Sequence, residues 1–380
     1  MSLSKSRFIE MFDLYKEKKL SEVAEIIMGQ SPDSNSYNNT EMGLPFYQGK
    51  TEFSDKYIGS PVTWCSSPCR IAEKNDILMS VRAPVGDVNI ATEKCCIGRG
   101  LASIRPLDGE STFLFYALKL KKAEIASKGN GSTFKAINKE TVHSITIPDV
   151  PQELKVKFSM FAEQIDKSKF LLQKILEKLE LLKKSRFIEM FGTIQDSKFP
   201  KESLEKICLF IKDGTHQTPT YTDDKINGYK FLSSKDVTSK KIEWNNIKYI
   251  PKELHEKLYS KLSPKFGDIL LAKNGTTGVA AIVETDEVFD IYVSLALIRP
   301  NSDINVKYLW SAINSDDSKH QFDSSLKGIG VPNLHLGEIK KTKIIIPPLK
   351  LQQEYALFVD QIDKSKLVIQ KSLEDLVGKS

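Results

Sequence analysis

The residues that could do chemistry in this sequence stand in three short groups, and none of them completes a catalytic motif. Asp149, Glu153 and Lys155 imitate a nuclease signature, but acids in the first turn of a helix are already favoured by the helix dipole. Residues 346–349 (Ile-Pro-Pro-Leu) lack the polar and the aromatic member of the loop with which adenine methyltransferases hold a flipped base. Residues 129–135 resemble a phosphate loop but lack its Gly-Lys-Ser/Thr ending. The sequence therefore predicts no catalytic residue.

Four cysteines come closest to a metal site. Cys65 and Cys69 have the spacing of a ligand pair, and Cys95 and Cys96 are adjacent. Zinc needs four ligands around one point, whereas adjacent residues of a strand point to opposite faces. We therefore expect no metal site, with a zinc site on these cysteines as the alternative. The five histidines are scattered and form no ligand pair.

Composition narrows the class of protein without fixing it. The chain has 380 residues, enough for two or three domains, and its 40% hydrophobic and 27% charged residues are typical of a globular protein. A formal charge of +6 suits a nucleic-acid partner, but it fits a basic protein without nucleic acid equally well. We find no signal peptide and no apolar run of membrane-spanning length, and the odd number of cysteines suggests reduced thiols. We expect a cytoplasmic protein with no membrane partner.

The chain repeats itself in circular order. Residues 3–12 (LSKSRFIEMF) match residues 182–191 (LKKSRFIEMF) at nine of ten positions, and residues 161–169 (FAEQIDKSK) match residues 358–366 (FVDQIDKSK) at seven of nine. In the middle of the chain the second motif is followed by the first, but the C-terminal copy has no room for its follower, which stands at the N-terminus instead. A repeat of this kind predicts two similar structural units.

Weaker similarities fill the space between these motifs and predict a mixed α+β fold for both units. They pair residues 75–80 with 267–272, 100–106 with 294–300, and 145–148 with 344–347. The units differ most around residues 37–50 and 221–235, and divergent loops on a shared scaffold are what two readers of different ligands need.

Two long helices are predicted to follow the units. Residues 152–191 contain no Gly or Pro, with Pro151 placed for the helix start and Gly192 for the C-cap. Forty residues at ~1.5 Å each make about 60 Å of helix. Its predicted coiled-coil positions, at spacings of three and four, are Leu172, Ile175, Leu179 and Leu182, and those of the sister helix, residues 351–377, are Ile362, Ile369, Leu373 and Leu376. We expect an antiparallel pair, with two separate surface helices as the alternative.

Each unit is predicted to open with a short amphipathic helix and to continue in short strands. The helix positions are Leu20, Val23, Ala24 and Ile27 in the first unit and Leu204, Ile207, Cys208 and Ile211 in the second. The predicted strands include residues 76–80, 97–105, 268–272 and 279–283. The expected organisation is an N-terminal helix (1–12), a first domain (13–150), a central helix (151–192), a second domain (193–347) and a C-terminal helix (348–380).

The order and duplication of these parts resemble the specificity subunit of type I restriction-modification systems. Local phrases agree with the resemblance, namely Lys212-Asp-Gly-Thr-His-Gln-Thr-Pro219, Ser234-Lys-Asp-Val237, Gly267-Asp-Ile-Leu270 and Ile346-Pro-Pro-Leu-Lys-Leu-Gln-Gln353. The first unit departs from the pattern, because it has Gly29-Gln-Ser-Pro32 and Pro148-Asp-Val-Pro-Gln152 at the matching places.

The resemblance implies a division of labour between this chain and its partners. The two units would be target-recognition domains that read a split double-stranded DNA target, with the helices setting an unread gap. Two modification subunits would carry S-adenosylmethionine and flip the adenine, and motor-nuclease restriction subunits would use ATP and Mg²⁺, so this chain would hold no cofactor. The alternatives are a coiled-coil adaptor between proteins and an orphan specificity protein without restriction partners.

DNA sequence is read by side chains that reach base edges, while lysine and arginine on phosphates set the register. Candidates are polar, basic and aromatic residues on the glycine-rich loops. In the first unit they are Gln30, Ser31, Tyr47, Gln48, Lys50, Arg82, Arg99, Asn130 and Lys135, and in the second they are Lys212, Thr215, His216, Ser233, Ser234, Lys235, Lys273, Asn274 and Thr276.

Overall fold

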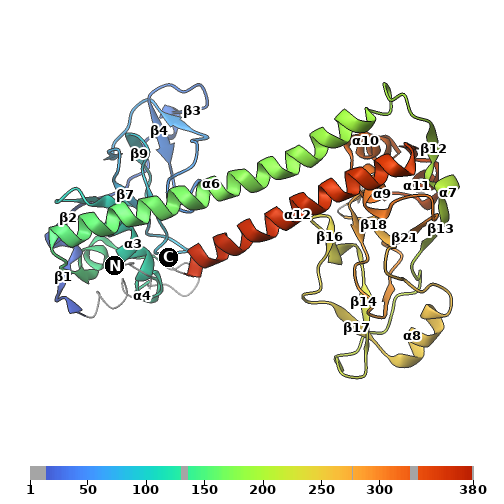
Figure 1. Ribbon diagram of the computed structural model, residues 1–380. Coiled ribbons are helices and arrows are strands. Elements are labelled where there is room, and N and C mark those ends of the chain that lie inside the picture. Colours follow the sequence, from blue (N-terminus) through green and yellow to red (C-terminus); the bar gives the residue numbers. More distant parts are fainter. Residues whose placement is uncertain (1–13, 130–135, 276, 326–332, 379–380) are drawn as a thin grey trace. The chain divides into compact units, whose positions relative to one another are not determined.

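A computed structural model describes residues 14–129, 136–275, 277–325 and 333–378 of the chain. The chain divides into two compact units, which we call unit 1 (residues 1–173 and 371–380) and unit 2 (residues 174–370). Each unit combines short strands with helices (Figure 1). The predicted helix of residues 1–12 lies outside the described residues. Because each unit includes part of both long helices, the five domain boundaries expected from the sequence stay predictions.

Unit 1 is built on one antiparallel and one mixed sheet. Its four-stranded antiparallel sheet has the order β2-β10-β7-β8, made of Ala24–Met28, Leu101–Pro106, Ile77–Ser80 and Val88–Ile90. A five-stranded sheet has the order β3-β5-β4-β9-β6, made of Tyr37–Asn38, Trp64–Cys65, Leu44–Tyr47, Cys95–Ile97 and Ile71–Ala72. The pair β1 (Glu17–Lys19) and β11 (Thr146–Pro148) and the helices α2 (Leu20–Val23), α3 (Ser111–Leu120), α4 (Lys122–Ser127) and α5 (Lys139–His143) complete it.

Unit 2 repeats this plan. Its antiparallel sheet has the order β13-β21-β18-β19, made of Cys208–Asp213, Leu295–Pro300, Ile269–Ala272 and Ala280–Ile282. Three further groups are β17-β14-β20 (Lys248–Ile250, Tyr229–Leu232, Phe289–Ile291), β12-β22 (Lys201–Ser203, Lys343–Ile345) and β15-β16 (Val237–Thr238, Lys241–Ile242). Its helices other than the long pair are α7 (Leu204–Ile207), α8 (Lys252–Tyr259), α9 (Val306–Ile313), α10 (Asp316–Ser325) and α11 (Leu336–Lys341).

The repeat predicted from the sequence is confirmed down to single side chains. Asp76 on the approach to β7 accepts a hydrogen bond from Arg105 Nε at 2.8 Å, and Asp268 accepts one from Arg299 Nε at 2.7 Å. Both aspartates are almost fully buried. Each unit also contains a parallel pair of strands, which is β4–β9 in unit 1 and β14–β20 in unit 2. The two units therefore share one mixed α/β fold.

The predicted strands are largely confirmed, whereas the predicted opening helices are wrong in length. Residues 76–80, 268–272 and 279–283 contain β7, β18 and β19, and residues 97–105 are divided by a turn between β9 and β10. The helices α2 and α7 last only one turn, after which the chain continues as the strands β2 and β13. A short apolar run cannot be assigned to helix or strand by periodicity alone, and here the β-branched Ile26, Ile27 and Ile211 favour the strand.

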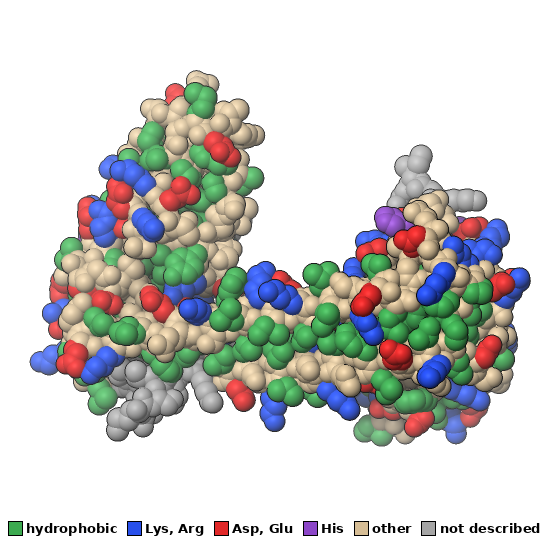
Figure 2. All heavy atoms as spheres, turned by 45° about the horizontal axis from the view of Figure 1, so that its top comes forward, with side chains coloured by type: hydrophobic (Ala, Val, Ile, Leu, Met, Phe, Trp, Pro, Cys, Tyr) green, Lys and Arg blue, Asp and Glu red, His purple; other side chains and the backbone are tan. Residues whose placement is uncertain are grey.

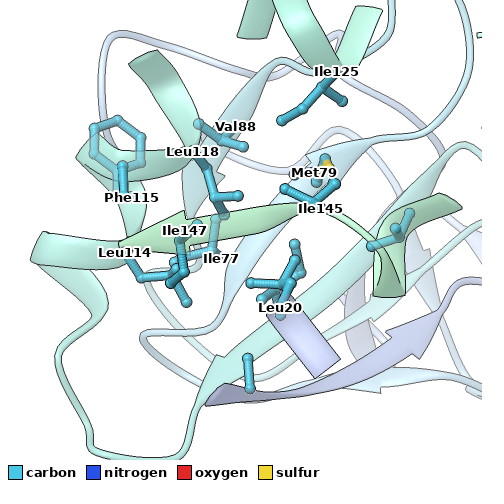
Figure 3. Packing of buried hydrophobic residues seen from close by; sticks show 14 of the residues in the cluster. Leu20, Ile77, Met79, Val88, Leu114, Phe115, Leu118, Ile125, Ile145 and Ile147 are labelled. Atoms are coloured by element: carbon cyan, nitrogen blue, oxygen red, sulfur yellow. The ribbon is translucent and has the colours of Figure 1, made fainter. Parts of the chain in front are cut away.

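The core of unit 1 lies between its antiparallel sheet and the helices. Figure 3 shows Ile77, Met79 and Val88 from the strands packing with Leu114 and Leu118 from α3. All five side chains are buried. Leu20 from α2 and Ile145 and Ile147 near β11 close the same cluster, so one-turn α2 serves to anchor the start of the unit.

The two long helices have nearly the predicted bounds. Helix α6 covers Gln152–Phe191, as expected, and α12 covers Leu349–Gly378, two residues longer at its start than predicted. The amide of Gly192 donates to the carbonyl of Ile188 at 2.7 Å, and its φ of +75° is the left-handed conformation that favours glycine after a helix.

Within unit 2 the two helices run antiparallel. Lys183 contacts Asp363 at 2.5 Å, while further along α6 Arg186 contacts Glu354 at 3.5 Å, so residue numbers rise on one helix as they fall on the other. The Tyr355 hydroxyl also donates to the carbonyl of Lys183 at 3.3 Å.

The predicted contact positions are wrong for two residues. Ile175 and Leu182 are 43% and 46% exposed, whereas Lys183 and Phe187 are buried. The contact between α6 and α12 therefore lies further along α6 than predicted. Paired charges and aromatic rings form it, and the Phe187 and Tyr355 ring centroids are 5.4 Å apart. Ile362 is buried as expected, while Leu172, Leu179, Ile369, Leu373 and Leu376 are half-buried.

Candidate nucleic-acid interface

Three loop segments of unit 1 are held together at one end of its strands. They follow β2, β4 and β9, and three backbone hydrogen bonds join them, namely Gln30 N to Ile97 O (3.1 Å), Gly98 N to Tyr47 O (2.8 Å) and Gly100 N to Gln48 O (3.1 Å). A fourth segment, 81–82 after β7, is joined to them by the bond from Val81 N to Gly100 O (2.9 Å). We call the four segments 29–31, 48–50, 81–82 and 98–100 the loop cluster of unit 1.

Glycine is required where these segments meet. A Cβ on Gly29 would lie 2.2 Å from the carbonyl oxygen of Gly98, which is a backbone atom. Such a distance is not tolerated, so Gly29 allows the loop after β2 to approach the loop after β9 closely. This glycine thus helps to explain how residues from separate strands present side chains on one surface.

The side chains of this cluster are polar and basic. Gln48 Nε2 donates to Ser31 Oγ at 2.9 Å, which fixes the amide beside the exposed Gln30. Arg99 projects from the turn between Gly98 and Gly100, and the bond from Val81 N to Gly100 O (2.9 Å) brings exposed Arg82 next to it. Among the described residues, no carboxylate pairs with either arginine, so both guanidinium groups are available to an anionic partner.

Two of the residues predicted in unit 1 have other partners. Tyr47 is 1% exposed and donates its hydroxyl to the carbonyl of Gly59 at 3.0 Å, so it is a core residue and its prediction as a DNA contact is wrong. Burial also raises the pKa of its hydroxyl. Lys50 pairs with Asp87 at 2.5 Å but stays partly exposed. The predicted contacts Asn130 and Lys135 lie outside the described residues.

Unit 2 carries the same cluster, built by matching hydrogen bonds. The bonds are Thr215 N to Ile291 O (3.0 Å), Tyr292 N to Leu232 O (2.8 Å), Gly214 N to Leu295 O (3.2 Å) and Lys273 N to Ser294 O (2.8 Å). We call the segments 213–216, 233–235, 273–274 and 292–294 the loop cluster of unit 2. The scaffold is therefore constant while the side chains change.

Most predicted residues of unit 2 lie on this cluster. The side chain of His216 is 74% exposed, with Nε2 3.6 Å from Asp213, and Thr215 precedes it. Ser233 donates through its backbone nitrogen and its hydroxyl to Asp236, at 2.7 and 3.0 Å. These bonds hold the turn that presents Lys235 to solvent.

The prediction of Lys273 as a DNA contact is also wrong. It is 5% exposed and its ammonium group lies 2.5 Å from Asp213, so it neutralises a carboxylate inside the fold and does not reach DNA. Lys212, one residue before that aspartate, is exposed on β13, with its ammonium group 5.2 Å from the Phe210 ring. Thr276 lies outside the described residues.

In unit 2, the cluster residues Tyr292 and Ser294, and Asn333 beside the cluster, were not predicted. Tyr292 and Ser294 form its turn, and Ser294 Oγ accepts a hydrogen bond from the amide of Ser234 at 3.0 Å. Asn333 pairs with Asn274 as an isolated bridge, as Ala136 does with Arg82 in unit 1. The available signal was the repeat itself, because residues 294–300 match 100–106 and so point to the residues just before them.

The alternative chemistries are not supported by the described residues. Asp149, Glu153 and Lys155 are in three separate ion pairs, with Lys18 (2.8 Å), Lys157 (2.5 Å) and Asp108 (2.6 Å). Cys95 and Cys96 belong to different hydrophobic clusters on the two sides of β9. In the described ranges, no group of three or more His, Cys, Asp or Glu residues could hold a metal ion, and no helix is long and apolar enough to cross a membrane.

Two copies of one α/β unit, each with a polar loop cluster on equivalent strands, define a protein of the tandem recognition-domain class. A family model described as the type I restriction modification DNA specificity domain matches residues 13–181 and 214–377. The chain belongs to this family.

The chain is similar in sequence to proteins described as type I restriction enzyme specificity subunits. The chain is 44% identical over 177 residues to a Methanocaldococcus jannaschii protein assigned as the MjaX type I restriction enzyme specificity subunit, which covers 46% of this chain and 40% of that protein. It is 24% identical over 384 residues to the MjaVIII specificity subunit of the same organism, covering 94% and 88%. The chain thus spans less than half of the MjaX relative and most of the MjaVIII relative.

A solved structure has the same fold over almost the whole length. The crystal structure of the type I restriction-modification system S subunit from M. genitalium matches with a TM-score of 0.58 and 15% identity, covering 96% of this chain and 93% of that one. At this identity the match concerns the fold alone.

Proposed function

We propose that this chain recognises a bipartite DNA target for a type I restriction-modification complex and is not itself an enzyme. Each loop cluster reads one half of the target. The observation that carries the proposal is the duplicated cluster, in which one backbone frame presents different side chains. Gln30, Gln48 and Arg99 in unit 1 stand where unit 2 has Thr215, Ser233 and Val293.

The side chains suit direct reading of bases. Arginine reads guanine and glutamine reads adenine through paired hydrogen bonds in the major groove. Unit 1 offers Arg82, Arg99 and Gln30 for such contacts, whereas unit 2 offers His216, Asn274 and Lys235. Two different sets of donors on one scaffold support two half-sites of different sequence.

The long helices are proposed to act as spacer and docking surface. Their antiparallel pairing in unit 2 and the circular order of the sequence motifs support a pseudo-twofold coiled coil that separates the two readers. Exposed apolar side chains on these helices include Leu181, Ile188, Leu357 and Val368, and Figure 2 shows hydrophobic side chains gathered along their surface. Two methyltransferase subunits would dock there, bringing S-adenosylmethionine, and restriction subunits would add ATP- and Mg²⁺-dependent cleavage.

The experiment is methylation mapping with a reconstituted complex of this chain and its methyltransferase partner. The expected result is one methylated motif with two specified ends and an unspecified middle, and no methyl transfer by the purified chain alone. A methylated motif that is one continuous sequence without an unspecified middle would contradict the proposal of two independent DNA-reading units. Methylation of random sites would favour the adaptor alternative, in which the coiled coil joins proteins and neither unit selects DNA.

Lys212→Ala and Lys235→Ala are each expected to weaken DNA binding of the full chain in a salt-dependent way. Each lysine lies on the loop cluster of unit 2 or beside it, and a lost phosphate contact reduces the slope of log affinity against log salt by ~0.9. Titration of a duplex at several salt concentrations measures the slope. Lys206→Ala is the matched control. This exposed lysine pairs with Glu202 and lies just before β13, at the opposite end of the strand from Lys212. Slopes equal to that of the control would remove Lys212 and Lys235 from the interface.

A further inference from the structure

A second basic feature of unit 1 adjoins the loop cluster and shares Lys50 with it. A cavity of about 310 Å³ is lined by residues of the loop between β4 and β5, the β7–β8 turn, the start of β8 and the helices α3 and α4. Its charged residues are Lys50, Lys119, Lys122, Asp55 and Asp87. Three ammonium groups against two carboxylates leave it with one net positive charge.

Asp87 organises the lysines of this cavity. One of its oxygens lies 2.5 Å from Lys50 Nζ, and the other contacts Lys122. Burial alone would raise the pKa of Asp87, but the hydrogen bonds from the two lysines outweigh it and hold that pKa below its ordinary value. The carboxylate is therefore ionised at neutral pH and keeps two ammonium groups side by side.

The lysines keep hydrogen-bonding capacity beyond these contacts. Each ammonium group has three N–H donors. Lys119 donates one hydrogen bond to the carbonyl oxygen of Asp55 at 3.0 Å. Because this oxygen is uncharged, the positive charge of Lys119 is not neutralised by it. Lys122 is half-exposed, so a ligand that enters from solvent can reach it. The arrangement suits one ligand with several anionic oxygens, as in a phosphate group.

The cavity is connected directly to the loop cluster. Lys50 follows Gln48 by two residues, and Ser80 Oγ donates to the carbonyls of Arg82 and Pro84, each at 2.8 Å. The Gly86 amide binds the carbonyl of the same Ser80 at 2.9 Å. A rigid turn thus joins the arginine of the cluster to the cavity wall, so one extended ligand can contact both.

Among the described residues of unit 2, lysine is absent from the positions that correspond to Lys119 and Lys122, although Lys235 follows Ser233 by two residues as Lys50 follows Gln48. Aligned from their N-caps, Glu110 and Asn305, helices α3 and α9 place Asn314 where unit 1 has Lys119. The Asn314 side chain is fully engaged with the backbone of Ala280, through two bonds of 3.1 Å. The basic cavity is therefore an addition to the common scaffold rather than part of it.

We propose that Lys50, Lys119 and Lys122 form a binding site for one backbone phosphate of the DNA duplex, beside the bases that unit 1 reads. The inference rests on the proposed function and goes beyond it, because it assigns α3 and α4 to the interface. Asp87 positions the lysines and competes with the phosphate. This phosphate sets the register of unit 1 on the duplex, and it carries no sequence information itself.

The first arm of the test compares three variants of the full chain. A pool of random-sequence duplexes is titrated between about 50 and 200 mM salt, and bound sequences are recovered. The double variant Lys119→Gln/Lys122→Gln is expected to lower affinity and to reduce the log–log salt slope by ~0.9. Asp87→Asn is expected to change affinity in the opposite direction. Lys94→Gln is the matched control, because this half-exposed lysine pairs with Glu73 at the opposite end of β9 from Arg99.

The outcomes separate this inference from the proposed function. If the wild-type chain enriches a sequence but the double variant keeps the slope of the Lys94→Gln control, the phosphate site is wrong and sequence recognition stands. If the wild-type chain enriches no sequence, both fall. A second arm heats the protein with inorganic phosphate. Stabilisation of the wild type that Lys122→Gln abolishes, with an unchanged duplex slope, would assign the cavity to a free anion and overturn the DNA contact.

Discussion

Asp268→Ala is expected to lower the free energy of unfolding of unit 2 by about 3 kcal/mol, because removing one partner of a buried ion pair leaves the other uncompensated. Asp268 is 1% exposed and accepts two hydrogen bonds from Arg299, both at 2.7 Å. It also accepts the amide of Lys265 at 2.8 Å, which shapes the turn into β18. The guanidinium group is itself partly exposed, so we expect the lower end of the range for such pairs.

Urea unfolding of the full chain, followed by a signal from unit 2 such as Trp310 fluorescence, measures this loss. Asp303→Ala is the control, since this aspartate is exposed and a surface substitution changes stability by only about 0.5 kcal/mol. Asp76→Ala should cost unit 1 a similar amount, because Asp76 accepts the same pair of bonds from Arg105, at 2.8 and 2.9 Å. A loss below 1 kcal/mol in both units would show that the repeated pair does not hold the sheets.

The sequence predicted the parts of the fold that rest on long or repeated patterns. Helix α6 was placed to the residue because forty positions without glycine or proline leave no other regular structure, and the repeats located β7 and β18. The opening helices were too long because four apolar positions at helical spacing also fit one helical turn followed by a strand. Tertiary pairing of β2 and β13 with β10 and β21 decided for the strand.

The sequence predicted exposed side chains correctly in the loops but not at the strand ends, and contact of these side chains with DNA stays a prediction. Gln30, Gln48 and Arg99 follow strands beside glycines, and such positions are exposed. Tyr47 is the last residue of β4 and Lys273 directly follows β18, and the alternation of side chains turns both into the core. Which face a terminal residue takes depends on register, and a single sequence does not contain that information.

A matched seven-residue insertion in both long helices is expected to widen the unread middle of the DNA target by about three base pairs. Seven residues add about 10 Å of helix at ~1.5 Å each, and B-DNA rises ~3.4 Å per base pair. The insertions fall between Leu172 and Leu179 in α6 and between Ile369 and Leu373 in α12. A heptad rotates the apolar positions by only about 20°, so the helix contacts can persist.

The readout is sequence selection by the chain alone, followed by methylation mapping of the complex. Selection by the chain does not depend on methyltransferase docking. Loss of the docking surface can therefore be distinguished from loss of the spacing function of the helices. Both half-sites are expected to keep their bases, because the insertions change no residue of either loop cluster. The ion pairs Lys183–Asp363 and Arg186–Glu354 should also survive, since both insertions lie beyond them.

The same experiment separates two roles of the helices. If they set the distance between the readers, the spacing of the half-sites must follow the length of the paired helices and must not change when one reader is mutated. An insertion of four residues turns the segment by about 40°, at 3.6 residues per turn, and should impair selection of the complete target while each half-site remains selectable. If the helices serve only as docking arms, the double heptad variant will fold and select a target with the original gap. That single result would end the ruler interpretation and leave the two loop clusters as independent DNA readers.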